Sequence, residues 1–398
     1  MAAIIATTAS LAAVLSATLL AATSLAVALL IAASLAAALL TAASLAAALL
    51  AAALLAALVA IPIAMMRPIV GRRMERPLYE PSSFGVEAER ISPVTDDGLA
   101  LAAWLVRPQQ KPGMHGTRNA PSVSSEQSKP YAPSARNAPS VSSEQSKPYA
   151  PSVPSAPRAT VIIVSGIENP SVTAFFGYSR MLAANGYASL LVEMRAHNGS
   201  EGDGVWLGMK EWLDVKACVG YICADAQLGA LPIVAMGTSM GGAVVGVAAG
   251  ELPRIDGVVS VSAYSSWADV FADMMVQKGV PRFFAALEKP FVNLYCGFRF
   301  GFGCLKYTAS NGVLKLGGRP LLLMHSKGDT QVPYASFGRL LAKARAAGAA
   351  VDTFVRDGDH HFVCYAECFT QPERDEGFSD VLLGFLGKVS HFGQKADN

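Results

Sequence analysis

The chain has 398 residues, of which 52% are hydrophobic and 16% charged, against a charged share of roughly 25% in average soluble domains. The deficit is local, because the segment 1–66 contains no Lys, Arg, His, Asp or Glu. With 32 Lys and Arg against 30 Asp and Glu, no concentrated basic face is expected that could displace counterions from phosphates. Composition therefore disfavours a nucleic-acid partner.

The segment 1–66 predicts a helical membrane anchor. It consists mostly of Ala and Leu, and it repeats the nine residues AASLAAALL at a period of ten. About 20 apolar residues span a bilayer, and the best single span is 45–66. A basic linker, 67–84, follows with four Arg, and the positive-inside rule puts this flank and the domain after it on the cytoplasmic side. The alternatives are a signal peptide, which needs a charged start, and an Ala/Leu expansion that does not insert.

A second low-complexity region interrupts the rest of the chain. The segment 118–135 recurs almost unchanged at 136–153, and both copies are rich in Pro, Ser, Gln and Lys. Such a composition cannot bury enough apolar surface to offset chain entropy. We therefore expect 109–158 to be a disordered surface insertion.

The remaining sequence alternates strands with helices. Asp97 and Gly98 suit a tight hairpin between strands at 91–95 and 99–106. Continuous apolar runs, typical of strands covered on both faces, follow at 159–164, 187–192, 232–236, 258–261, 320–324 and 351–355. Helical periodicity links several of them, most clearly at 212–222 and 337–346. The pattern predicts an α/β domain over 85–390, with an eight-stranded, mostly parallel sheet, helices on both faces and a short tail, 391–398.

Ligands bind such sheets at the carboxyl ends of the strands, and the strongest motif lies there. Gly237, Thr238, Ser239, Met240 and Gly241 form G-x-S-x-G between a strand and a helix of small residues. In that context Gly on both sides permits a strained turn that exposes the hydroxyl. Ser239 is therefore the candidate nucleophile, and the alternative is a bystander Ser in a tight turn.

A serine nucleophile needs a base, and the base needs an orienting anion. Asp329 follows the strand at 320–324, and the adjacent His360 and His361 follow the strand at 351–355. We prefer His360 as the base because it directly follows a Gly-Asp turn, and His361 is the alternative.

The order Ser239, Asp329, His360 resembles the α/β-hydrolase superfamily over about residues 85–390, the insertion excepted. The segment 193–202 is similar to the D-x-R-G-H-G-x-S-x-G loop of that family, with Glu193 at the first position. The resemblance implies an oxyanion hole made by the backbone N–H groups of Ile167 and Met240, although Ser165 stands where the family usually has His.

The segment 265–318 interrupts the strand rhythm where the superfamily often inserts a small lid. Within the twenty positions 283–302 it contains seven aromatic residues, which predict either an apolar pocket over the nucleophile or a lid buried on the domain: Phe283, Phe284, Phe291, Tyr295, Phe298, Phe300 and Phe302. The six Cys form no C-x-x-C pair, so neither a metal site nor a cofactor is predicted.

These features predict a membrane-anchored serine hydrolase that cleaves an ester or thioester bond. The expected substrate is a small-molecule or lipid-like acyl compound with an apolar acyl group. The alternatives are a serine peptidase, an acyltransferase of the same superfamily, or a catalytically silent binding module.

Overall fold

The computed structural model describes residues 18–27, 29–30, 42–108, 157–167, 170–365 and 368–396. Most of the predicted insertion and part of the apolar N-terminal segment lie outside these residues.

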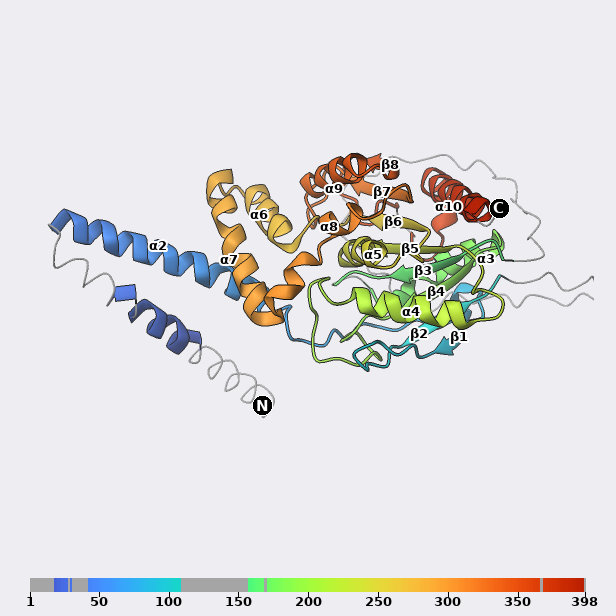
Figure 1. The fold of residues 1–398 in the computed structure, drawn as a ribbon, viewed down its shortest axis with the longest axis horizontal. Coiled ribbons are helices and arrows are strands. Elements are labelled where there is room, and N and C mark those ends of the chain that lie inside the picture. The colour runs from blue at the N-terminus through green and yellow to red at the C-terminus, as the bar shows by residue number, and fades with distance from the viewer. Residues whose placement is uncertain are drawn as a thin grey trace, which may run out of the picture.

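One eight-stranded sheet organises the domain, with the order β1-β2-β4-β3-β5-β6-β7-β8 (Figure 1). The strands are β1 (Glu89–Ile91), β2 (Ala103–Val106), β3 (Thr160–Val164), β4 (Ala188–Val192), β5 (Ile233–Thr238), β6 (Gly257–Val261), β7 (Pro320–Ser326) and β8 (Ala350–Arg356). The strands from β4 to β8 in this order pair in parallel, whereas β1 pairs antiparallel with β2, and β2 with β4. The predicted α/β sheet and its apolar strands are confirmed, and the sheet is mixed at one edge.

The predicted hairpin exists, but its strands are shorter than expected. Glu89 pairs with Leu105 and Ile91 with Ala103, and a single bridge between Val94 and Ala100 lies nearer the turn. Gly98 has φ +86°, as the tight turn requires.

Helices cover both faces of the sheet. Side chains alternate along β3, so that Ile162 and Val164 face one core and Val161 and Ile163 the other. The first core is closed by α4 (Trp212–Ala224), α5 (Met240–Glu251), α8 (Ala309–Val313) and α9 (Ala335–Ala346). The second is closed by α3 (Phe176–Ala184) and α10 (Glu376–Ala396). Short 3-10 turns lie at Pro81–Phe84, Val172–Phe175, Phe302–Lys306 and Pro372–Arg374.

Between β6 and β7 the chain forms two long helices, α6 (Trp267–Gln277) and α7 (Arg282–Phe300), at one end of the domain. The apolar helix α2 (Ala42–Met66) extends away from this end (Figure 1). The segment after α2 packs on the domain, because Val70 bridges to Val205, and Met74 N–H donates to the carbonyl of Ala196 at 2.7 Å.

Candidate active site

Ser239 occupies a strained turn between β5, which ends at Thr238, and α5, which begins at Met240. Its φ of 58° and ψ of −122° are unusual for a residue with a side chain, and such conformations cost of order 1–3 kcal/mol. Its N–H donates to the carbonyl of Val261 at 2.8 Å, which fixes the turn to the neighbouring strand. The side chain is only partly buried.

The two flanking glycines are required by close backbone approach. A Cβ at Gly237 would lie 2.2 Å from the carbonyl oxygen of Gly241, and a Cβ at Gly241 would lie 2.4 Å from that of Ser165. The G-x-S-x-G pattern therefore follows from packing between β5, α5 and the loop after β3.

Asp329 lies in the loop after β7 and is buried. Its Oδ1 accepts hydrogen bonds from the backbone N–H groups of Gln331 and Val332, both at 2.9 Å. Its Oδ2 lies 2.9 Å from Nδ1 of His361. Burial raises the pKa of Asp329, but the His361 hydrogen bond and the other polar contacts outweigh burial and hold that pKa below its ordinary value. Asp329 is thus a carboxylate at neutral pH.

The imidazole beside Asp329 belongs to His361, which corrects the preference for His360. His361 is buried, whereas His360 is partly exposed and lies edge-on against Tyr365 at 5.2 Å between ring centroids. The two histidines lie in the loop after β8, where a hydrogen bond from Val363 N–H to the carbonyl of His360 at 2.8 Å closes a turn. His361 is therefore the candidate base.

The two ring nitrogens of His361 have different environments. Because an ionised carboxylate can only accept hydrogen bonds, Nδ1 carries the proton toward Asp329. Within the described part of the chain, Nε2 is buried and has no hydrogen-bond partner. A buried imidazole nitrogen left without a partner is available to accept a proton.

A second buried histidine, His325, also lies near Asp329 and was not predicted. Its Nε2 donates to the carbonyl of Val332 at 2.8 Å and lies 3.7 Å from Oδ2 of Asp329. Burial lowers the pKa of His325, which favours the neutral ring. The sequence signal for this contact was its position near the end of a strand, four residues before Asp329.

The predicted oxyanion donors lie in the loop after β3 and at the start of α5. Met240 is the first residue of α5, so its N–H has no acceptor within the helix. The carbonyl of Ile167 accepts a hydrogen bond from the Arg76 guanidinium at 2.8 Å. Arg76, predicted only as part of the basic flank, therefore helps to position this loop.

The loop 193–202 is held by buried polar contacts. Glu193 accepts hydrogen bonds from the hydroxyl of Ser171, from Val172 N–H at 3.2 Å and from the Asn198 amide at 2.8 Å. Arg195 is buried in an ion pair with Asp214 at 2.7 Å. These contacts give the loop a structural role.

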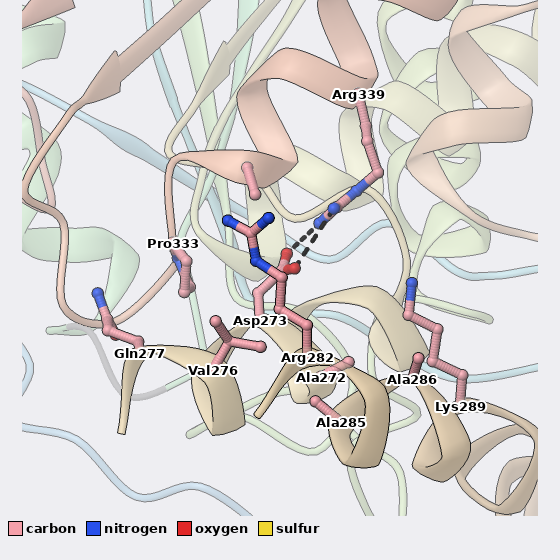
Figure 2. A pocket seen from close by; sticks show the side chains of 11 residues that line it. Ala272, Asp273, Val276, Gln277, Arg282, Ala285, Ala286, Lys289, Pro333 and Arg339 are labelled. Atoms are coloured by element: carbon pink, nitrogen blue, oxygen red, sulfur yellow. Dashed lines mark hydrogen bonds and ion pairs between the residues drawn. The ribbon is translucent and has the colours of Figure 1, made fainter. Parts of the chain in front are cut away.

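A cavity of about 380 Å³ lies between α6, α7 and the start of α9 (Figure 2). Asp273 and Arg339 form an ion pair in its wall, and Arg282 and Lys289 also line it. Ser239, Asp329 and His361 do not line this cavity. Its connection to the site is Gln277, whose side-chain amide donates to the carbonyl of Asp329 at 2.9 Å.

The aromatic residues of the lid do not gather as expected. Phe300 is buried and stacks on Trp206 at 5.1 Å, but Phe283, Phe284 and Phe298 are exposed. Neither the pocket nor the buried lid predicted from the sequence accounts for these three side chains.

Side chains that could ligate a metal do not cluster in the described residues. All six cysteines are free thiols. Across the described ranges, no group of three or more His, Cys, Asp or Glu side chains could hold a metal ion.

Three comparisons with known proteins bear on the fold. The family model described as X-Pro dipeptidyl-peptidase (S15 family) matches residues 97–288, which include Ser239 but neither Asp329 nor His361. The Pyrococcus furiosus esterase Pf2001 superposes with a TM-score of 0.53 at 18% identity, over 81% of this chain and 100% of the esterase. A structure of DcsB in complex with its substrate analogue gives a TM-score of 0.50 at 13% identity, over 77% of this chain and 100% of DcsB.

A puromycin hydrolase structure also gives a TM-score of 0.50 at 13% identity, over 76% of this chain and 39% of that protein. No curated protein matches the sequence. At these identities the likeness to solved structures shows a common fold.

Proposed function

We propose that the chain is a serine hydrolase of the α/β-hydrolase type that cleaves an ester or thioester with an apolar acyl group, because residues 97–288 match a peptidase family model and the fold is shared with a known esterase. Ser239 is the nucleophile, His361 the base and Asp329 the orienting carboxylate. The observation that carries the proposal is the buried Asp329–His361 pair, with Nε2 of His361 left without a partner among the described residues.

The proposed roles imply the following chemistry. His361 accepts the hydroxyl proton of Ser239 as the oxygen attacks the acyl carbonyl, and Asp329 stabilises the resulting imidazolium. The backbone N–H groups of Ile167 and Met240 hold the oxyanion of the tetrahedral intermediate. The proton then passes from His361 to the leaving group. Water, deprotonated by His361, next attacks the acyl-enzyme, which releases the carboxylic acid and restores the Ser239 hydroxyl. The reaction uses no cofactor.

We further propose that α2 anchors the enzyme in a membrane. Leu49–Met66 is long and apolar enough to cross a bilayer, with a mean hydropathy of 2.6 and only 11% of the window buried. Arg67, Arg72, Arg73 and Arg76 follow it and favour a cytoplasmic catalytic domain. Arg73 also has a role in the fold, because it donates to the carbonyls of Asn198 and Ser200 at 2.6 and 3.0 Å.

A peptidase is the second candidate, and the match of residues 97–288 to the X-Pro dipeptidyl-peptidase family favours it. The two activities share the acylation chemistry and differ in the leaving group. Parallel assays with p-nitrophenyl esters of graded chain length and with an X-Pro p-nitroanilide separate them. An ester hydrolase turns over the esters, and a peptidase also turns over the anilide.

Labelling with a fluorophosphonate probe tests the proposed nucleophile. The full-length protein is expected to be labelled, and Ser239→Ala is expected to abolish labelling. Ser262→Ala is the matched control, since Ser262 also follows a strand, has a positive φ of 47° and is buried. Labelling that persists in Ser239→Ala, or folded wild-type protein that is never labelled, would contradict the proposal.

A further inference from the structure

One face of α7 exposes large apolar side chains. Phe283 is 69% exposed, Phe284 47%, Leu294 42% and Phe298 76%. At about 100° per residue, these four positions fall within an arc of about 100°. Single exposed apolar side chains are ordinary on protein surfaces, but four on one helix face form a contiguous patch, and such patches mark interaction sites. We call these four residues the α7 aromatic face.

The other faces of α7 are already occupied. Ala285, Val292 and Cys296 pack into the domain and are buried. Arg282 and Lys289 line the cavity beside α6 (Figure 2). The α7 aromatic face is therefore a second apolar surface on a helix whose first apolar surface is satisfied.

The helix that carries the aromatic face, α7, lies next to the proposed membrane anchor. Helices α2 and α7 are in contact, and α7 runs across the end of α2 where α2 meets the domain (Figure 1). Met66, the last residue of α2, is buried against the indole of Trp267 in α6. Near the C-terminal end of α7, the Arg299 guanidinium lies against Gly71.

This arrangement matches a helix in a membrane interface. A helix that crosses the end of a spanning helix lies along the bilayer surface, and its apolar face then points into the acyl region. Cationic side chains at that level meet the lipid phosphates, and Arg72 and Arg299 are near the junction of α2 and α7.

We infer that the α7 aromatic face is a membrane-contact surface, which holds the lid against the bilayer that α2 crosses. This inference rests on the proposed anchoring by α2 and extends the proposed activity: the substrates are acyl compounds dissolved in the membrane. Because Gln277 of the adjoining α6 is bonded to the Asp329 loop, the lipid-facing lid is connected directly to the catalytic machinery.

Quenching by brominated lipid tests the contact independently of catalysis. The full-length protein is reconstituted in phosphatidylcholine vesicles, with and without bromine on the acyl chains. Phe298→Trp and Phe283→Trp each add one indole, and the fluorescence of the four native Trp is subtracted using the wild type. We expect brominated lipid to reduce the added signal at least about twofold, because bromine quenches only at close range. Tyr365→Trp is the matched control, since Tyr365 is 55% exposed outside the lid and is expected to keep its signal.

Equal quenching at 298 and 365, or a chain that does not float with vesicles, overturns the inference. Protection of position 298 by a second copy of the chain would appear as self-crosslinking without lipid quenching, and it also overturns the inference. The activity arm uses the double variant Phe283→Ser/Phe298→Ser. Its hydrolysis of soluble p-nitrophenyl acetate is expected to be unchanged, whereas hydrolysis of a long-chain ester in vesicles falls several-fold. Absence of probe labelling would refute the hydrolase and leave the quenching result valid.

Discussion

Two regions of this molecule depart from the simple rule of apolar inside and polar outside, and they do so in opposite ways. At the carboxyl edge of the sheet, the charged and polar groups of Asp329 and His361 are buried and paired. In the second region, α2 and the α7 aromatic face expose apolar side chains at the surface. Burying the polar groups of the first region costs desolvation free energy, which the Asp329–His361 pairing offsets. The exposed apolar side chains of the second region mark a surface that we propose contacts a membrane.

The contrast predicts that the two regions can be damaged separately. Substitutions at the sheet edge should change catalysis and leave membrane association intact. Substitutions in α2 should change membrane association and leave hydrolysis of a soluble ester intact. The predictions below test this separation.

The largest effect is expected at the paired histidine. His361→Gln removes the base, so kcat for a p-nitrophenyl ester should fall on the order of 10⁴-fold or more. His360→Gln, one residue away and outside the Asp329 pair, should keep kcat within about threefold, because its ring lies against Tyr365. Both variants should float with vesicles as the wild type does. Equal losses in the two variants would refute the choice of His361.

The next effect concerns the packing that supports Ser239. Gly241→Ala puts a Cβ 2.4 Å from a backbone oxygen, which forces the turn to move. We expect a loss of more than about 3 kcal/mol in unfolding free energy together with loss of probe labelling. Gly220→Ala in α4 is the control, because no atom lies within 4 Å of its new Cβ, and it should gain about 0.5–1 kcal/mol. Denaturant unfolding in detergent measures both.

The sequence predicted the sheet edge far better than the lid. The apolar strands and the turn at Ser239 could be predicted because their sequence patterns are local. The two glycines that flank Ser239 are required by close backbone approach. The choice between His360 and His361 depended on which side of one loop faces Asp329, which composition does not encode. The exposure of Phe283, Phe284 and Phe298 was not predicted, because hydrophobicity alone does not tell a buried aromatic side chain from one at a surface.

A charge within α2 should break the second region alone. Leu54→Lys adds a cation inside the proposed span, at a cost of about 3 kcal/mol for insertion. The variant should shift from the membrane to the soluble fraction, while turnover of p-nitrophenyl acetate per folded molecule stays unchanged. Leu54→Ile is the control and should remain in the membrane fraction. If Leu54→Lys floats with vesicles as the wild type does, α2 is not the anchor.

The dependence of stability on acidic pH tests whether the buried Asp329 is held as a carboxylate. Because the pKa of Asp329 is held below its unfolded value of 3.8, its ionised form stabilises the fold above that pH. This contribution should decline as the pH falls from 3.8 toward the folded pKa, by up to about 1.4 kcal/mol per pH unit. The difference in melting temperature between wild type and Asp329→Asn, measured from pH 6 to pH 2, should therefore be constant above about pH 5 and shrink below. A difference that grows on acidification would mean that burial, not His361, dominates the carboxylate.

The smallest effect is expected where the two regions meet. Arg76 follows the last residue of α2 by ten positions, and its guanidinium donates to the carbonyl of Ile167 in the proposed oxyanion loop. Loss of one such hydrogen bond is worth about 1 kcal/mol, so Arg76→Met should lower kcat about fivefold with little change in KM. Arg76→Lys should recover part of kcat, since an ammonium can still donate to the carbonyl. If Arg76→Met instead raises KM alone, Arg76 acts on substrate binding and the oxyanion loop is positioned without it. If neither changes, the link between anchor and active site is structural, and the separation of the two regions is complete.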